Sequence, residues 1–172
     1  MTSIIKVDQI QNAAGGVPTA SDLGLDVSGS VLQVKHGYYS TEITNSTTNY
    51  VNTGLSLSIT PSSTSSSVLV IVNQQTKFRS DYDQGMGLRI SRNGSDIWTS
   101  TTRFDEYIYD GTSTTEADSR GRRPVMWLDS PATTSAVTYA VQGACHRSDY
   151  NAQGKFQDNG NYSFITLMEI AG

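Results

Sequence analysis

Short runs in which hydrophobic and polar residues alternate fill the chain from about residue 30 to its end, and this two-residue period is that of β-strands. In the run 55–59, Leu55, Leu57 and Ile59 alternate with serines, which predicts a strand with one buried face. The run 136–145 alternates in the same way. Its apolar face comprises Val137, Tyr139, Val141, Gly143 and Cys145.

Three of these runs have a second face that is also suited to contact. Residues 68–72 are five β-formers in a row, residues 163–170 are apolar on both sides, and the second face of 136–145 carries small side chains. A strand that is apolar on both faces needs cover on both. The simplest cover beyond the core is a cyclic homo-oligomer packed through one sheet. We therefore predict that an oligomer interface includes Ala140, Ala144, Ile165 and Leu167.

Turn signals divide the body into about eight short strands. Asn93–Gly94 supplies the positive φ angles of a tight turn, so residues 86–101 are predicted to form a hairpin. Further strands are expected at 31–39 and 125–128, an edge strand or crossing loop at 41–52, and loops at 104–119 and 149–161. The predicted fold of residues 30–172 is an all-β antiparallel sandwich of jelly-roll type.

The leader, residues 1–29, is too short to form a core of its own. Ile4, Ile5, Val7 and Ile10 form a small apolar stripe, and Gly15–Pro18 reads as a turn or joint. The stripe must pack on the body, on other copies, or on another protein. We predict that the leader is a docking segment.

Composition excludes several classes of function. The 172 residues carry only 16% charged side chains and a net charge of -4, which disfavours a nucleic-acid binder. The one basic cluster, Arg120–Arg123, is interpreted as a solvated loop. Cys145 is the single cysteine, so no internal disulfide forms, and its place in an apolar run predicts a buried, inert thiol. The chain shows no signal peptide and no apolar run of membrane-spanning length, so we expect no membrane insertion.

No pattern predicts catalysis, a metal or a cofactor. A serine with His146 and Asp149 could be imagined as a triad, but the Gly-X-Ser-X-Gly elbow is absent and His36 is the only other histidine. Asp81, Asp83, Asp105 and Glu106 could include a glycosidase pair, yet solvated loop acids are the default. The run 81–85 lacks the remaining ligands of a calcium loop.

Loop aromatics are the remaining candidates for binding. The set comprises Tyr82, Trp98, Tyr107, Tyr109 and Tyr150. Such rings stack on sugars and anchor protein interfaces. Trp98 could instead pack in the core, and several tyrosines could cover subunit contacts. We predict that Tyr82, Tyr107 and Tyr109 contact a host glycan or receptor.

Segments 4–10, 31–34, 53–70 and 165–170 of the chain resemble small fibre-type structural proteins of tailed phages, especially phages of marine bacteria and cyanobacteria. The resemblance implies a homotrimeric virion component, assembled in the host cytoplasm, whose N-terminal segment docks on another virion protein. Its body would be similar to the trimeric jelly rolls of tumour-necrosis-factor and C1q type. The expected role is a non-enzymatic tail or neck fibre. The alternatives are a head-decoration or cement protein and, as an outsider, a carbohydrate-active tailspike enzyme.

Overall fold

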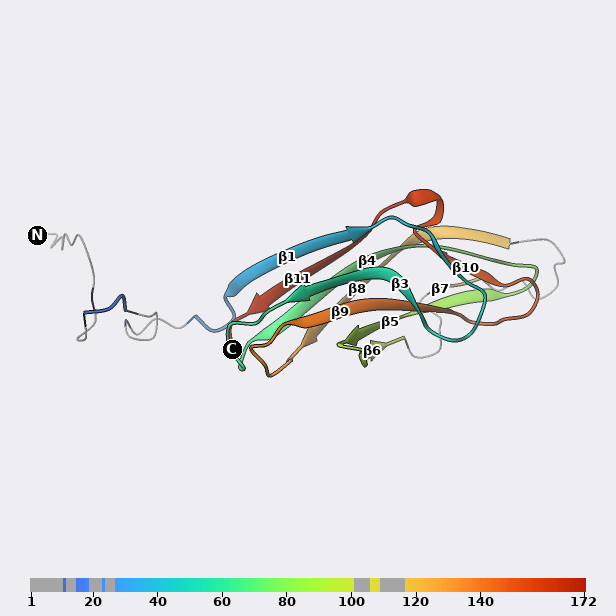
Figure 1. Ribbon diagram of the computed structural model, residues 1–172. Helices are drawn as coiled ribbons and strands as arrows, with labels where there is room; N and C mark the ends of the chain where they lie inside the picture. The colour runs from blue at the N-terminus through green and yellow to red at the C-terminus, as the bar shows by residue number, and fades with distance from the viewer. Residues whose placement is uncertain (1–10, 12–14, 19–22, 24–26, 101–105, 109–116) are drawn as a thin grey trace, which may run out of the picture.

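The computed structural model describes residues 11, 15–18, 23, 27–100, 106–108 and 117–172, and it contains a body made of β-strands (Figure 1). The strands are β1 (Val31–Tyr39), β2 (Ile43–Asn45), β3 (Val51–Ile59), β4 (Ser67–Ser80), β5 (Gln84–Arg92), β6 (Ser95–Thr99), β7 (Glu106–Ile108), β8 (Ala117–Asp129), β9 (Val137–Cys145), β10 (Gln153–Phe156) and β11 (Ser163–Ile170). A short 3-10 helix (Asp158–Gly160) separates the last two strands.

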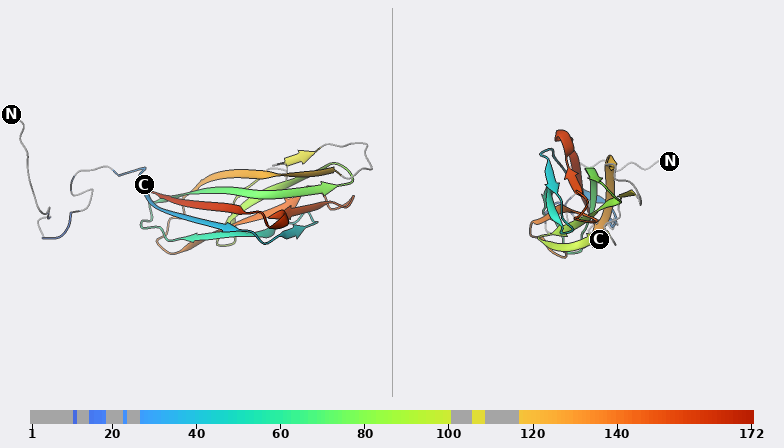
Figure 2. Two further views of the ribbon diagram at one scale, coloured as in Figure 1. Left: turned by 90° about the horizontal axis from the view of Figure 1, so that it is seen from above. Right: turned by 90° about the vertical axis from the view of Figure 1, so that its right-hand side faces the viewer.

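The strands form two antiparallel sheets packed face to face (Figure 2). Sheet A has the order β1-β11-β4-β8, with β10 and β2 continuing beside the second half of β4. Sheet B has the order β3-β9-β5-β6, and β7 pairs with the start of β5. Eight strands form the two four-stranded layers, and along the chain they alternate between the sheets except at the β5–β6 hairpin. These strands are β1, β3, β4, β5, β6, β8, β9 and β11. This arrangement confirms the predicted sandwich and its jelly-roll order.

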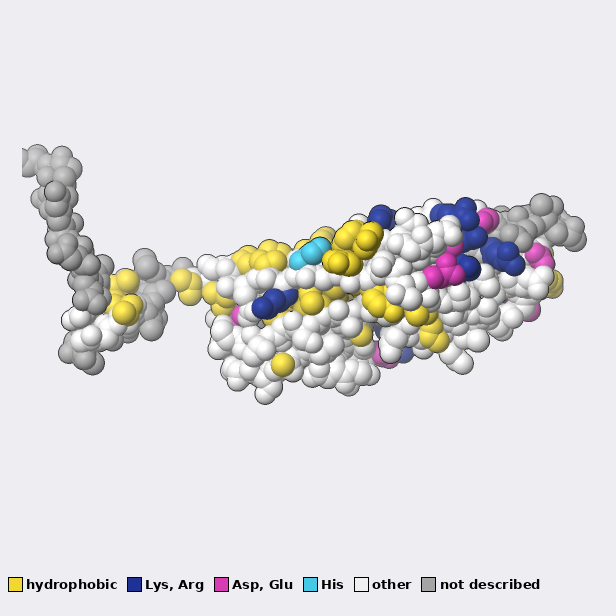
Figure 3. Space-filling model, turned by 45° about the horizontal axis from the view of Figure 1, so that its top comes forward, with side chains coloured by type: hydrophobic (Ala, Val, Ile, Leu, Met, Phe, Trp, Pro, Cys, Tyr) yellow, Lys and Arg dark blue, Asp and Glu magenta, His cyan; other side chains and the backbone are white. Residues whose placement is uncertain are grey.

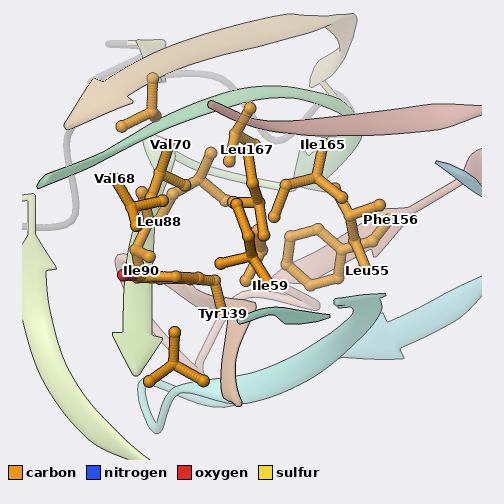
Figure 4. Close-up of a cluster of buried hydrophobic side chains, with 14 of the residues drawn as sticks. Leu55, Ile59, Val68, Val70, Leu88, Ile90, Tyr139, Phe156, Ile165 and Leu167 are labelled. Atoms are coloured by element: carbon orange, nitrogen blue, oxygen red, sulfur yellow. The ribbon is translucent and has the colours of Figure 1, made fainter. Parts of the chain in front are cut away.

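One hydrophobic core fills the space between the sheets (Figure 4). Sheet A contributes Val68, Val70, Ile165 and Leu167, and sheet B contributes Leu55, Ile59, Leu88, Ile90 and Tyr139. These side chains are at most 2% exposed. Burial of each large apolar side chain stabilises the fold by about 1.5–3 kcal/mol.

The structure confirms the predicted hairpin turn but places strands in two segments that were predicted to be loops. Asn93 and Gly94 have φ angles of 49° and 86°, so the predicted hairpin turn is confirmed. The interpretation of Arg120–Arg123 as a solvated loop is wrong, because these residues lie within β8 and pair with residues 74–77 of β4. The predicted loop 149–161 contains β10, a four-residue strand. Both strands form because long β4 offers backbone partners that their own residue patterns do not reveal.

Along one edge of β4 the paired strand changes from β11 to β10 near Gln74 and Gln75. A buried polar network fills this junction. The Ser163 hydroxyl accepts hydrogen bonds from the Gln74 side chain (2.8 Å) and from the Gln75 backbone N–H (2.9 Å), and the Gln157 amide lies 2.8 Å from it. From sheet B, the Thr53 hydroxyl donates a hydrogen bond of 3.1 Å to the side-chain oxygen of Gln74. All five residues are buried, so each polar group depends on these partners.

A buried carboxylate ties together the end of the body next to the leader. The Glu169 carboxylate accepts hydrogen bonds from the Gln33 side chain (2.6 Å) and from the backbone N–H (2.7 Å) and hydroxyl (2.6 Å) of Ser62. Burial alone would raise the pKa of Glu169, but these donors outweigh it and lower the pKa to about 2. At neutral pH the charged group therefore holds β1, β11 and the β3–β4 loop in register.

Replacement of Ser163 by alanine should lower the free energy of unfolding by about 1–3 kcal/mol, because buried donors on Gln74 and Gln75 would lose their acceptor. Urea denaturation measures this change. Ser58→Ala is the matched control. The Ser58 hydroxyl is exposed on sheet B, so its loss should cost no more than about 0.5 kcal/mol. Equal effects of the two substitutions would contradict a structural role for the buried network.

The stability of the protein should fall in acid through Glu169. Its folded pKa lies below the ordinary value of 4.5, so its contribution is complete above about pH 4.5 and is lost as the pH falls toward 2. The contribution amounts to at most about 3 kcal/mol. Thermal unfolding from pH 7 to pH 2 should show a shallower decline in Glu169→Gln than in the wild type. Parallel curves would show that Glu169 is not responsible.

Candidate functional site

The end of the body opposite the leader holds the densest group of charged and aromatic side chains on loops. We call it the distal end and define it by the β4–β5 turn (residues 81–83) and the β9–β10 loop (residues 146–152). At the other end, Ser30 and Ala171 are joined by a backbone hydrogen bond of 2.9 Å, so leader and C-terminus share one end (Figure 1). The 14-residue β4 connects the two ends over about 45 Å.

Two stacked tyrosines and an arginine organise the distal end. The Tyr82 and Tyr150 rings lie 5.0 Å apart at an interplanar angle of 28°. The Arg147 guanidinium carbon lies 4.3 Å from the Tyr150 ring centre and 4.9 Å from that of Tyr82. Arginine stacks on aromatic faces in this way because its planar cation is attracted to the ring electrons.

The same arginine pairs with two acids of the distal end. Arg147 donates to Asp83, and it donates through two N–H groups to Asp149 at 2.5 and 3.1 Å. Its hydrogen bond lowers the pKa of Asp149 and raises the pKa of Arg147 itself. Tyr107 also donates its hydroxyl proton to Asp83. Both carboxylates therefore serve to position Arg147.

The β9–β10 loop holds an unusual backbone conformation at its exposed tip. Tyr150 and Asn151 have φ angles of 51° and 54°, in the left-handed region that non-glycine residues rarely adopt. The Tyr150 carbonyl oxygen accepts hydrogen bonds from the Asp81 N–H (2.9 Å) and the Ser80 hydroxyl (3.1 Å). These bonds fix the loop to the β4–β5 turn and hold the Tyr150 ring outward, where the residue is 52% exposed.

The structure brings together only part of the predicted contact set. Tyr82 lies at the distal end and Tyr107 of β7 contacts it through Asp83 and His146, whereas Tyr109 lies outside the described residues. Arg147 was missed by the sequence analysis, although a charged and aromatic segment directly after a strand was the signal that could have found it. The predicted docking residues Ile4, Ile5, Val7 and Ile10 also lie outside the described residues.

The predicted oligomer interface is wrong for three of its four residues. Ile165 and Leu167 point into the core and are fully buried within one chain, and Ala144 is fully buried as well (Figure 4). Ala140 is half-buried in β9. The alternation within β11 was predicted, but both of its faces are apolar, so the sequence could not show which face met sheet B.

The opposite face of β11 belongs to an apolar outer surface on sheet A. One row across four strands comprises Val34, Met168, Leu69 and Leu128, and the next comprises His36, Thr166, Ile71 and Met126. Val34, Met126 and Leu128 are 54%, 69% and 58% exposed. Figure 3 shows hydrophobic side chains gathered along the part of the body nearer the leader, while charged side chains gather toward the distal end.

Two of the acids considered for chemistry have structural partners, whereas Asp105 lies outside the described residues. Asp149 pairs with Arg147, and Asp81 accepts a hydrogen bond from Asn151. The Cys145 thiol is buried, which confirms that prediction, and burial raises its pKa to about 11. Within the described residues, no three His, Cys, Asp or Glu side chains are placed to share a metal ion. Over the same part of the chain, no helix has the length and apolar character needed to cross a membrane.

Comparisons with known proteins give weak similarity in structure. No protein-family model matches the chain. No curated protein matches it. A chain in the structure of infectious bursal disease virus Gx strain aligns with 84% of this chain and 33% of its own, at 11% identity and a TM-score of 0.45. A chain of T=1 particles derived from infectious bursal virus aligns with 84% of this chain and 37% of its own, at 11% identity and a TM-score of 0.40.

This chain therefore spans about a third of the length of those viral chains. Both TM-scores are below 0.5, so the fold assignment rests on the strand pairing described above.

Proposed function

We propose that this protein is a non-enzymatic structural component of a phage virion, a homotrimeric tail or neck fibre. Its leader docks on another virion protein, and its sandwich presents the distal end to the host surface. The observation that carries this proposal is the apolar outer surface of sheet A. The resemblance of four sequence segments to phage fibre proteins supplies the virion and the number of subunits.

The two outer faces of the sandwich differ in a way that supports self-association. The outer face of sheet A carries one apolar row four strands wide and a second row that is apolar on β4 and β8, whereas the outer face of sheet B carries hydroxyl groups at Ser56, Ser58 and Thr138. Soluble monomers rarely expose a large contiguous apolar patch, because its burial against another surface is favourable by about 25 cal/mol per Å². A cyclic trimer that packs sheet A toward its axis removes this patch from water.

The direction of the body supports the division between docking and display. Leader and C-terminus lie at one end, and the Arg147 cluster lies at the other. In a trimer with its axis along the strands, three leaders would meet at one end and three distal ends would point away from it. This geometry suits a projecting fibre.

The purified protein should have a mass of about three times 18.6 kDa by light scattering. Met126→Asp should convert it to folded monomers, because a charge would be placed in the desolvated interface while the exposed position leaves the core untouched. Ser56→Asp places the same charge on the exposed face of sheet B and should leave the mass unchanged. A monomeric wild-type protein, or a Met126→Asp variant that keeps its wild-type mass, would contradict the sheet A interface.

Deletion of residues 1–16 should leave a folded oligomer that no longer joins particles, because the apolar stripe of the leader would be lost while the body is retained. The measurement is the amount of the protein on phage particles purified from cells that supply either the full chain or the truncated chain. Circular dichroism and light scattering of the truncated protein serve as controls for folding and assembly. Normal incorporation of the truncated chain would refute docking through the leader.

A further inference from the structure

We propose that a hollow beside Tyr150 at the distal end binds a neutral saccharide, with a sugar ring packed against the exposed Tyr150 side chain. The hollow has a volume of about 500 Å³ and lies between the β9–β10 loop, the end of β4 and Ser46. Small-ligand sites have volumes of about 300–1,000 Å³. The inference names the chemistry of the display end and rests on the proposed function for its biological setting.

Tyr150 provides a flat apolar platform that is already fixed in place. Tyr82 stacks beside it, Arg147 lies over its ring, and yet the residue remains 52% exposed. An aromatic ring whose position is set by neighbours loses little conformational entropy when a ligand packs on it. The exposed ring is suited to the apolar face of a pyranose, as aromatic side chains generally present a large flat contact area at low entropic cost.

The walls of the hollow are polar and offer hydrogen bonds of both kinds. Ser148 supplies a hydroxyl group, Asn151 and Gln153 supply amides, and Arg79 and Asp149 supply a cation and an anion. Amides and hydroxyl groups both donate and accept. A ligand with several hydroxyl groups around a ring can hydrogen-bond to such a mixture, whereas an apolar ligand would displace water from these groups without replacing its hydrogen bonds.

The charges of the hollow favour a neutral ligand. Among its lining residues, Arg79 carries the one positive charge and Asp149 the one negative charge. Arg147 beside the hollow is already shared between Asp83 and Asp149. A phosphate or an acidic sugar would meet the Asp149 carboxylate, which is 63% exposed, without a net positive field to offset the repulsion.

Two of the six non-glycine residues with positive φ in the described part of the chain line the hollow. Tyr150 and Asn151 both adopt left-handed φ angles and both line it. Such conformations are unfavourable and persist where the surrounding structure enforces them, often at ligand sites. Here the hydrogen bonds to the Tyr150 carbonyl oxygen enforce the conformation, and its result is the outward ring.

The test is saturation-transfer NMR on the purified full chain with the methyl glycosides of glucose, galactose, mannose and N-acetylglucosamine at millimolar concentration. Methyl glucuronide and inorganic phosphate are the anionic comparators. At least one neutral glycoside should bind. Tyr150→Ala should weaken that binding about tenfold, as expected for loss of about 1.4 kcal/mol of contact. Tyr150→Phe keeps the ring and should retain binding.

Two further variants separate the ring from its surroundings. Tyr162→Ala removes another tyrosine of similar exposure, 50%, which packs beside Tyr38, and binding should be unchanged. Asn151→Gly removes one of the wall amides and its hydrogen bond to Asp81 while the Tyr150 ring remains, so it should weaken binding less than Tyr150→Ala does.

The inference is overturned if none of the four neutral glycosides shows transfer, if only glucuronide or phosphate binds, or if Tyr150→Ala binds as well as the wild type. These results are independent of assembly, because they need only the purified chain. A monomer that binds a neutral glycoside through Tyr150 would refute the trimer and support the saccharide site. A trimer without glycoside binding would do the reverse.

Discussion

The pairing of one edge of β4 with two successive strands is the constraint on which the rest of the structure depends. On one edge, β4 pairs with β8 along its length, and on the other edge it pairs first with β11 and then with β10. The break between these two strands would leave buried polar groups unpaired. Ser163 and the glutamines around it fill the break with side-chain hydrogen bonds. One strand can therefore extend from the leader end to the distal end, which gives the body its two distinct ends.

The same long strand explains why the two outer faces of the sandwich can differ without disturbing the core. Inward positions of β4, such as Val68 and Val70, are fully buried, whereas outward positions, such as Leu69 and Ile71, face away from sheet B. The core requires only the inward set. The outward set is thus free to be apolar over the half near the leader. In the other half of β4, toward the distal end, the outward positions include Lys77 and Arg79. Lys77 pairs with Asp118 there.

Sequence patterns predicted the elements whose local signal agrees with their final environment. The Asn93–Gly94 hairpin and the inward face of 137–145 follow from turn chemistry and from clear alternation. The patterns failed where tertiary pairing decides. Arg120–Arg123 became part of β8 because β4 offers partners, and β11 could not be oriented because Ile165 and Phe164 are both apolar. At the distal end, tyrosines were found by type, but the role of Arg147 depends on loops that meet only in the fold.

The distal end shows how a small polar module can hold an exposed aromatic ring without a large core beneath it. Arg147 contacts two rings and two carboxylates, so one side chain links the β4–β5 turn to the β9–β10 loop. The cost of the left-handed backbone at Tyr150 is offset by these contacts and by the bonds to its carbonyl oxygen. If stability alone shaped this loop, glycine at position 150 would remove the strain. It would also remove the exposed ring on which the proposed saccharide contact depends.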